Sequence, residues 1–185
     1  MALSSTIFKA SLQIADTNRN YYADHELTLA RHPSETDERM MVRLLAFALH
    51  AGERLCFTRG LCVDEEPDVW QKNLRDEIEL WIDVGLPDER RIRKACSRAR
   101  QVCLYLYGGR AVGPWWQRNA GRLPRFANLQ VVELPEEATR GMAGLVARSM
   151  QLAITIQDGE LWLNEGDRTL AISPVVRKGW EGGDV

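Results

Sequence analysis

Residues 77–85, EIELWIDVG, alternate between hydrophobic and polar side chains with the two-residue period of a β-strand. One face of the predicted strand is aliphatic and consists of Ile78, Leu80, Ile82 and Val84. The opposite face carries acidic side chains and one indole, namely Glu77, Glu79, Trp81 and Asp83. A half-buried strand whose charges face water has the same pattern, so the alternation alone favours a solvated acidic face. The rest of the chain decides whether this face carries chemistry.

Apolar residues at three- and four-residue spacing predict a helix before and a helix after this strand. The first spans residues 34–51, with Ser34 as its N-cap, Asp37 completing a capping box and Gly52 as its stop. The second spans residues 87–100 and begins with proline and acidic residues, which suit a helix start. Each helix has an apolar stripe with which it can pack on a sheet.

Further strands follow from alternation and turn signals. Antiparallel hairpins are predicted at both ends of the chain, within residues 6–30 and 150–165. The other predicted elements are strands at residues 55–61, 102–107, 128–134 and 168–173, helices at 114–119 and 136–150, and a brief helical turn at 67–71. This order predicts an α/β fold with a mixed central sheet flanked by helices and with added terminal hairpins. We expect one domain over residues 1–176 and a flexible tail over residues 177–185.

The amino-acid composition agrees with the predicted α/β domain. With 185 residues, 45% hydrophobic and 27% charged, the chain has the composition of a soluble globular protein. Its formal net charge of -2 excludes a global positive field, so any basic site must be local. The N-terminus lacks a signal-peptide pattern, and no apolar run reaches the ~20 residues of a membrane span. We therefore expect a cytoplasmic protein without a membrane partner.

The four cysteines are Cys56, Cys62, Cys96 and Cys103. They form no CxxC pair and have no zinc-ligand spacing with the histidines. Their apolar surroundings predict buried free thiols in a reducing compartment.

Glu38 is the first candidate for chemistry, because helical spacing places it on the apolar row of its helix. That row consists of Met41, Val42, Leu45 and Leu49. A carboxylate there faces protein and needs a partner, which favours a functional role. Alternatively, Glu38 complements the helix dipole and emerges at the edge of the stripe. Glu35 and Glu53 lie off the row and are predicted to be surface residues.

The loop before the central strand is acidic and contains Asp64, Glu65, Glu66 and Asp68. Such a run is most often a solvated loop. Its position, directly after one strand and before the acidic face of the next, also makes it a candidate source of metal-binding carboxylates. Both interpretations remain open.

The helix over residues 87–100 presents a basic row, Arg91, Lys94 and Arg98, away from its apolar stripe. These side chains can meet phosphate groups. A solvated helix face is the commoner role for such a row, and the low net charge of the chain favours it.

Five long segments carry a family resemblance: ARHPSETDERMMVRLLAF, FTRGLCVDEEPDVW, LWIDVGLPDERRIRKAC, RFANLQVVEL and TIQDGELWL. In their order and spacing they resemble the YaeQ family of bacterial proteins over nearly the whole chain. The resemblance implies a variation on the PD-(D/E)XK nuclease fold and a suspected activity. In that superfamily a helix supplies a Glu, one strand an Asp, and the next strand an acidic residue with a Lys two positions later. The carboxylates hold Mg²⁺, for which Mn²⁺ substitutes, and the metal activates water.

Carried over to this sequence, the pattern matches Glu38 to the helix Glu and Asp83 to the acidic residue of the second strand. The first Asp corresponds to Asp68 or Asp64, and Glu66 in the same loop is a third alternative. The resemblance thus implies metal ligands among these residues.

The motif Lys is missing, because Gly85 stands in its place. Some members of the superfamily draw the basic group from the following helix, so Lys94 or Arg91 is the implied catalytic cation. Residues implied to meet the substrate are Arg98, Trp81 and Glu79. Since Glu79 and Asp83 are about 13 Å apart along a strand, they cannot share one metal, and Glu79 is expected at the rim.

Two functions of different classes follow for this uncharacterised family. In the first, the chain is a magnesium-dependent nuclease or phosphodiesterase that acts on nucleic acid. In the second, the nuclease-like scaffold has lost catalysis and binds a nucleic acid or a protein, for instance in association with transcription. The glycine at position 85 favours the second function, and the inward-facing Glu38 favours the first.

Overall fold

The two terminal hairpins of the sequence join into one five-stranded sheet. The structure, a computed structural model, describes residues 4–59, 61, 63 and 65–181. The sheet has the order β10-β9-β8-β1-β2, and β1 runs parallel to β8 while the other neighbours are antiparallel. Its strands are β1 (Thr6–Asp16), β2 (Tyr21–Arg31), β8 (Ser149–Gln157), β9 (Glu160–Glu165) and β10 (Arg168–Ile172). The hairpins were predicted correctly, but not their union into one sheet.

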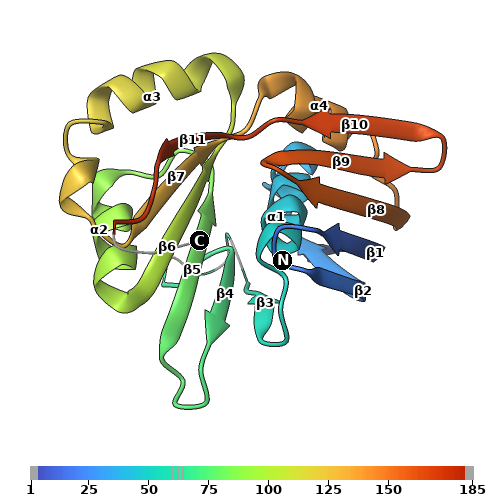
Figure 1. The fold of residues 1–185 in the computed structure, drawn as a ribbon, viewed down its shortest axis with the longest axis horizontal. Coiled ribbons are helices and arrows are strands. Elements are labelled where there is room, and N and C mark those ends of the chain that lie inside the picture. The colour runs from blue at the N-terminus through green and yellow to red at the C-terminus, as the bar shows by residue number, and fades with distance from the viewer. Residues whose placement is uncertain (1–3, 60, 62, 64, 182–185) are drawn as a thin grey trace.

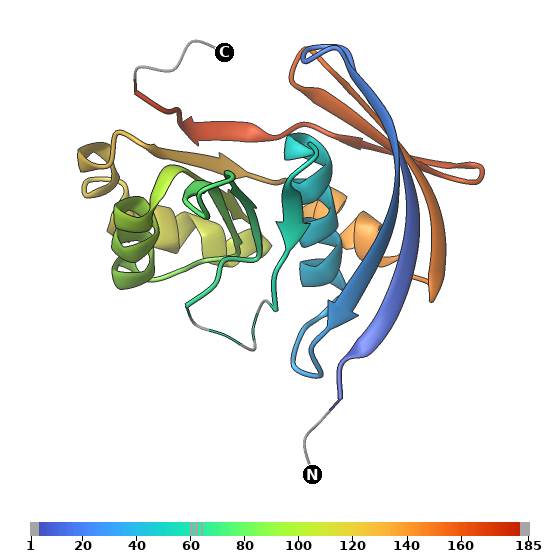
Figure 2. The same cartoon turned by 90° about the horizontal axis from the view of Figure 1, so that it is seen from below.

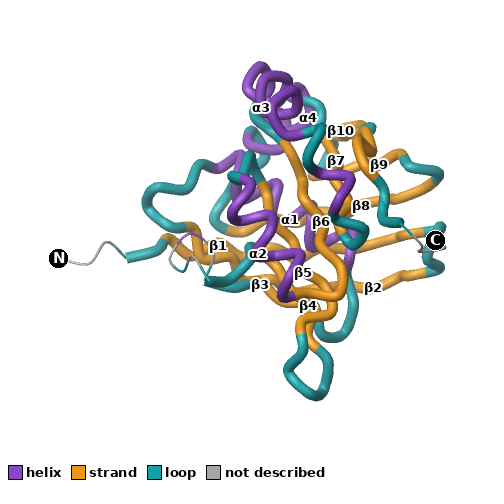
Figure 3. The backbone as a smooth tube through the Cα atoms, turned by 90° about the vertical axis from the view of Figure 1, so that its left-hand side faces the viewer, coloured by secondary structure: helices purple, strands orange, loops and turns teal. Residues whose placement is uncertain are grey.

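The central strand belongs to a second, six-stranded sheet of order β11-β7-β6-β5-β4-β3. Strands β5, β6 and β7 are parallel, and the remaining pairs are antiparallel. The strands are β3 (Leu55–Phe57), β4 (Val69–Lys72), β5 (Ile78–Val84), β6 (Ala99–Leu106), β7 (Leu129–Glu133) and β11 (Val175–Lys178). The turn between β4 and β5 protrudes from the body of the molecule (Figure 3).

Four α-helices of the described chain complete the fold, which is mixed α/β. They are α1 (Asp37–His50), α2 (Glu89–Arg98), α3 (Val112–Asn119) and α4 (Glu136–Ala143). Helix α1 lies between the two sheets, and the five-stranded sheet curves around it (Figures 1 and 2). Helices α2 and α3 cover the other face of the six-stranded sheet (Figure 1).

The core has two clusters, one on each face of the six-stranded sheet. The first contains Leu12 of β1, Leu45 of α1 and Ile82 of β5, so α1 binds both sheets together. The second contains Trp81 of β5 and Ile92 of α2. The face of β5 that the sequence predicted to be acidic and solvated is therefore largely buried under α2, as a helical crossover between parallel strands requires.

A β-bulge breaks the alternation of β5 at its start. The pairing register shifts between Gln71 and Lys72, so that Lys72 pairs with Ile78 and Gln71 with Leu80. Glu79 is the extra residue of the bulge. As a result Ile78 packs against the second cluster, whereas Leu80 belongs to the first. The predicted aliphatic face is thus continuous only from Leu80 onward.

Three of the differences from the predicted elements concern helices. Thr36, not Ser34, caps α1, because its hydroxyl accepts the backbone N–H of Arg39 at 3.1 Å. Residues 69–72 form strand β4, not a helical turn, because they pair with β5. Helix α4 ends at Ala143, since Gly144 follows and Ser149 already belongs to β8.

The tail predicted to be flexible from residue 177 is ordered as far as residue 181. Val175 and Val176 of β11 pair with β7. The indole N–H of Trp180 donates to the carbonyl of Val102 at 3.0 Å, and Glu181 donates its backbone N–H to Ala127 at 2.9 Å. Strand pairing and these hydrogen bonds therefore hold Lys178, Trp180 and Glu181 against the six-stranded sheet and its connections.

The cysteines of the described chain are free, but they are not all buried. Cys103 is buried, Cys96 is half-buried and Cys56 is exposed, while Cys62 lies outside the described residues. Burial raises the pKa of Cys103 to about 12, so it stays a protonated thiol. Among the described residues, no helix combines the length and the apolar character that a membrane span needs.

Candidate functional site

A cleft of about 400 Å³ opens where β4 begins and β5 ends. Val69 pairs with Ile82 across these antiparallel strands, so Asp68 and Asp83 are neighbours at the edge of the cleft. Both carboxylates are buried, with 2% and 4% of their residue surface exposed. The structure therefore brings together two of the carboxylates that the sequence singled out.

Both carboxylate oxygens of Asp83 bind a residue of α2. Arg91 donates Nε–H to one carboxylate oxygen and Nη2–H to the other, both at 2.8 Å. Burial raises the pKa of Asp83, and Arg91 opposes that shift, while the neighbouring Asp68 adds to it. A two-point guanidinium fork of this kind fixes the geometry of the carboxylate as well as its charge.

Asp68 is engaged by α1. It accepts Nη2–H of Arg39 at 2.7 Å and the backbone N–H of Val84 at 2.9 Å. Burial lowers the pKa of Arg39, but the carboxylates of Asp68 and Glu35 outweigh it and the net shift is upward. Both carboxylates at the cleft are thus paired with arginines that remain charged.

Glu35 is a core residue, and its prediction as a surface residue is wrong. Only 6% of it is exposed, and it accepts a two-point bond from Arg43 at 2.7 and 2.8 Å. Arg39 donates to the same carboxylate at 2.9 Å. Arg39 therefore links Glu35 to Asp68, and the network runs from α1 to the cleft. Glu53 is exposed, as predicted.

Glu38 lies on the inward row of α1, as predicted, but its partner is on α4. The buried hydroxyl of Thr139 donates to its carboxylate at 2.6 Å. Glu38 is not among the residues that line the cleft. It acts on the cleft electrostatically, because burial raises the pKa of Tyr107 to about 12 and Glu38 and Asp68 add to this shift, while Arg39 opposes it.

Gly85 has a backbone conformation that a lysine rarely adopts. Its φ angle is 111°, and its N–H donates to the carbonyl of Tyr105 at 2.9 Å. A Cβ atom at this position would have room, since its nearest neighbour would be Tyr107 at 3.9 Å. The backbone conformation, not crowding, therefore disfavours the motif Lys at position 85.

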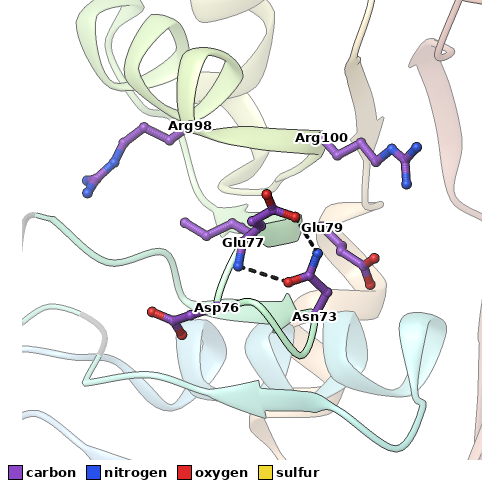
Figure 4. A pocket seen from close by; sticks show the side chains of 7 residues that line it. Asn73, Asp76, Glu77, Glu79, Arg98 and Arg100 are labelled. Carbon is purple, nitrogen blue, oxygen red and sulfur yellow. Dashed lines mark hydrogen bonds between the residues drawn. The ribbon is translucent and has the colours of Figure 1, made fainter.

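The residues implied to meet a substrate do not converge on the cleft. Trp81 has no exposed surface and packs in the second core cluster, so it presents no surface to a substrate. Glu79 and Arg98 line a different pocket of about 560 Å³, beside the turn between β4 and β5 (Figure 4). Glu79 accepts a hydrogen bond there from Gln71 at 3.2 Å.

The basic row of α2 divides between the cleft and the acidic loop. Arg91 turns to Asp83, whereas Lys94 forms an ion pair with Glu65. Arg98 pairs with the same Glu65 at 3.0 Å. Of the two candidate cations, Arg91 is the one for which the structure gives a contact with Asp83, at 2.8 Å.

Glu66, a further acidic candidate of the loop, is not among the residues that line the cleft. Glu66 pairs with Arg59 at 2.8 Å. Its backbone carbonyl accepts from Arg91 at 2.9 Å, which fixes the loop on α2. Asp64, the other candidate for the first acidic position, lies outside the described residues.

The described carboxylates do not fit the magnesium site that the resemblance implies. Over residues 4–59, 61, 63 and 65–181, no three His, Cys, Asp or Glu side chains lie close enough together to hold a metal ion. Magnesium demands near-octahedral oxygen ligation, so it would have to displace the arginines from Asp68 and Asp83. The arrangement instead resembles a closed, charge-balanced network.

Arg39 and Arg43 belong to the network and Tyr107 lines the cleft, but all three were missed in the sequence. Glu35, Arg39 and Arg43 are spaced four residues apart, which places them on one face of a helix and was a usable signal. Tyr107 follows β6 directly, and the ends of parallel neighbouring strands meet at one edge of a sheet.

Comparison with known proteins gives consistent matches over nearly the whole chain. The family model described as YaeQ protein matches residues 1–174. An uncharacterized protein YaeQ of Escherichia coli K12 is 51% identical over 173 residues, which cover 94% of this chain and 96% of the relative. One of Salmonella typhi is 49% identical over 172 residues, covering 93% and 95%.

Two solved structures are similar throughout. A crystal structure of YaeQ protein from Xanthomonas axonopodis pv. citri matches with a TM-score of 0.92 and 48% identity, covering 95% of this chain and 99% of that one. A crystal structure of YaeQ protein from Pseudomonas syringae matches with a TM-score of 0.91 and 32% identity, covering 96% and 98%. The chain therefore belongs to the YaeQ family.

Proposed function

We propose that this chain is a binding module built on a nuclease-like scaffold, in which arginine–carboxylate pairs stand where a nuclease holds its metal. The observation that carries this proposal is the two-point ion pair between Arg91 and Asp83. The matching pair between Arg39 and Asp68 extends it to the second carboxylate.

The order of the elements supports the nuclease-like scaffold. Glu38 lies on a helix, Asp68 directly precedes the first strand of a pair, and Asp83 lies near the end of the next strand. This is the succession of acidic positions that the resemblance to PD-(D/E)XK nucleases implies. The adjacency of Asp68 and Asp83 in the structure agrees with it.

The chemistry of the pairs supports a loss of catalysis. A nuclease of this type needs free carboxylate oxygens for the metal and a lysine that positions or activates water. Here the cation next to Asp83 is an arginine. Burial lowers its pKa, yet Asp83 and Asp68 raise it overall, so Arg91 does not act as a base.

A magnesium-dependent phosphodiesterase is the second candidate, and one observation favours it. Asp68 and Asp83 are neighbours at the edge of an open cleft, and two adjacent carboxylates are a minimal set of metal ligands. For this function the arginines must leave the carboxylates when metal and substrate arrive.

A cleavage assay separates the two candidates. The full chain and the variants Asp68→Asn and Asp83→Asn are incubated with labelled single- and double-stranded DNA and RNA, with Mg²⁺, with Mn²⁺ and without metal. The binding module predicts no metal-dependent cleavage by any of the proteins. Cleavage by the wild type that both substitutions abolish, in variants with unchanged circular dichroism, establishes the phosphodiesterase.

A further inference from the structure

Positive charge is concentrated in one continuous stretch of the chain. Residues 90–132 contain ten arginine and lysine residues and no aspartate or glutamate. Since the whole chain has a net charge of -2, the +10 of this stretch leaves -12 for all other residues. So strong an asymmetry within one chain is typical of a surface that meets a polyanion.

The fold gathers much of this stretch on one side of the molecule. It forms α2, β6, α3 and the short 3-10 helix Leu123–Arg125. Ile92, Trp115 and Leu123 bind the helical elements to the same face of the six-stranded sheet, in the second core cluster. Helices α2 and α3 are seen on that side in Figure 1. Exposed arginines of these elements and their connection include Arg90, Arg93, Arg118, Arg122 and Arg125. We call these five residues the arginine face.

Three guanidinium groups of the arginine face converge on one carboxylate. Arg93 donates to Glu89 at 2.9 Å and Arg122 at 2.6 Å, and Arg125 forms a further ion pair with it. These arginine side chains remain 64%, 63% and 47% exposed, respectively. Three cations around one anion leave an excess of two positive charges at this point.

Glu89 organises the arginines without using up their donors. Hydrogen bonds from Arg122, Arg125 and Arg93 lower the pKa of Glu89 to about 2, so its carboxylate is ionised at any physiological pH. A guanidinium has five N–H donors, and a carboxylate accepts about four hydrogen bonds in all. Glu89 can therefore occupy only a minority of the donors of the three arginines, although it holds these side chains close together.

We propose that the arginine face binds the sugar-phosphate backbone of a nucleic acid. This inference rests on the proposed binding function and specifies its partner and its surface. Guanidinium groups match phosphate oxygens with two parallel hydrogen bonds, and several of them on one face bind the backbone independently of base sequence.

The absence of apolar anchors on this face argues against a protein partner. Protein interfaces have an apolar, largely aromatic centre. The exposed large hydrophobic residues of the described chain are Ile7, Tyr22, Leu61, Leu74, Val175 and Val176. None of them lies within residues 90–132. A phosphate backbone needs no apolar centre, so a nucleic acid fits this face.

Fluorescence anisotropy with labelled single- and double-stranded DNA and RNA tests the inference on the full chain. We expect binding at low salt for at least one of these probes. Its logarithmic affinity should fall linearly with logarithmic salt concentration, with a slope of about -0.7 to -0.9 per phosphate contact. The variant Arg122→Glu/Arg125→Glu should bind at least about tenfold more weakly and lose about 1.5 from the magnitude of the slope.

A matched control has the same charge change on the other side of the molecule. Arg148→Glu/Arg168→Glu replaces two exposed arginines that each make one hydrogen bond to a backbone carbonyl. We expect less than about a twofold effect on affinity from these residues. Circular dichroism melting curves show that each variant is folded. Arg122→Gln/Arg125→Gln, which reverses no charge, must weaken binding in the same direction.

Glu89→Gln gives a test of opposite sign. It removes the anion at the centre of the face, so binding should strengthen by about two- to threefold. A purely structural role for this cluster predicts weaker binding instead.

Three results overturn the inference: no binding of any probe at low salt, equal weakening by the arginine-face variant and its control, or unchanged binding by the arginine-face variant. None of these three binding results depends on metal-dependent cleavage. The cleavage assay tests the proposed function separately.

Discussion

Asp83 is the metal ligand that the resemblance to nucleases implies, yet Arg91 binds both of its carboxylate oxygens. The sequence located both residues but could not show their contact, because it depends on how α2 crosses over β5. It also misjudged Glu35, whose burial follows from partners four and eight residues further along α1. The partner of a side chain depends on the three-dimensional fold. A sequence pattern therefore identifies candidate residues but not the contacts that they make.

Replacing Arg91 measures how much the buried pair contributes to stability. Arg91→Ala leaves the carboxylate of Asp83, whose side chain is 6% exposed, without its cation. We expect the free energy of unfolding to fall by about 3 kcal/mol, measured by urea denaturation. Arg93→Ala, two residues further along α2 and exposed, is the control and should cost less than about 1 kcal/mol. Equal losses for the two variants contradict the account.

His50 makes the stability depend on pH. Burial and the nearby Arg19 lower the pKa of His50 to about 4, from its ordinary value near 6.5. The unfolded chain therefore binds more protons between these values, so stability is complete above about pH 6.5 and is lost as the pH falls toward 4. Because His50 keeps some exposure, we expect a loss of about 2 kcal/mol.

The comparison variant for this pH effect is His50→Gln, which can still bond to the hydroxyl of Tyr105. Urea denaturation of both proteins at about pH 7 and about pH 4.5 isolates the contribution of the imidazole. The wild type should lose more stability on acidification than the variant. Parallel losses would show that His50 does not titrate as described.

At the scale of elements, the sequence predicted most helices and strands, and its errors occurred where a partner decides the structure. Strand β4 is short, with charged and proline-containing neighbours, and exists because it pairs with β5. Strand β11 likewise depends on β7. Local propensity cannot reveal such strands, whereas the hairpin of β1 and β2 has its own alternation and turn.

Substitutions at Thr36 and Ser34 test where helix α1 begins. Thr36 accepts the N–H of Arg39, so Thr36→Ala should lower the free energy of unfolding by about 1 kcal/mol. Ser34 bonds instead to His32 outside the helix, and Ser34→Ala should cost a few tenths of a kcal/mol. Thermal denaturation compares the two. A larger loss for Ser34→Ala would restore the predicted capping box.

The C-terminal segment tests whether the final strand stabilises the fold. Trp180 packs against the first core cluster and donates to the carbonyl of Val102. Trp180→Ala should therefore cost about 2 kcal/mol in urea denaturation. If residues from 177 onward formed a loose tail, the substitution would leave the midpoint unchanged.

At the scale of the whole molecule, α1 joins two sheets that the sequence could not place relative to each other. The parallel pairing of β1 with β8 links segments more than a hundred residues apart, and no local pattern encodes it. The same arrangement closes the charge network at the cleft, since α1 supplies Arg39 and α2 supplies Arg91. The excess of arginine and lysine in residues 90–132, by contrast, can be counted in the sequence. The fold is what brings these residues together on one surface.

Calorimetric titration of the wild type with Mn²⁺ and with Mg²⁺ tests the central claim, that arginines and not a metal balance Asp68 and Asp83. We expect no saturable heat at millimolar metal in the folded wild type. Saturable binding that Asp83→Asn abolishes would contradict it, and the cleft would then be a metal site.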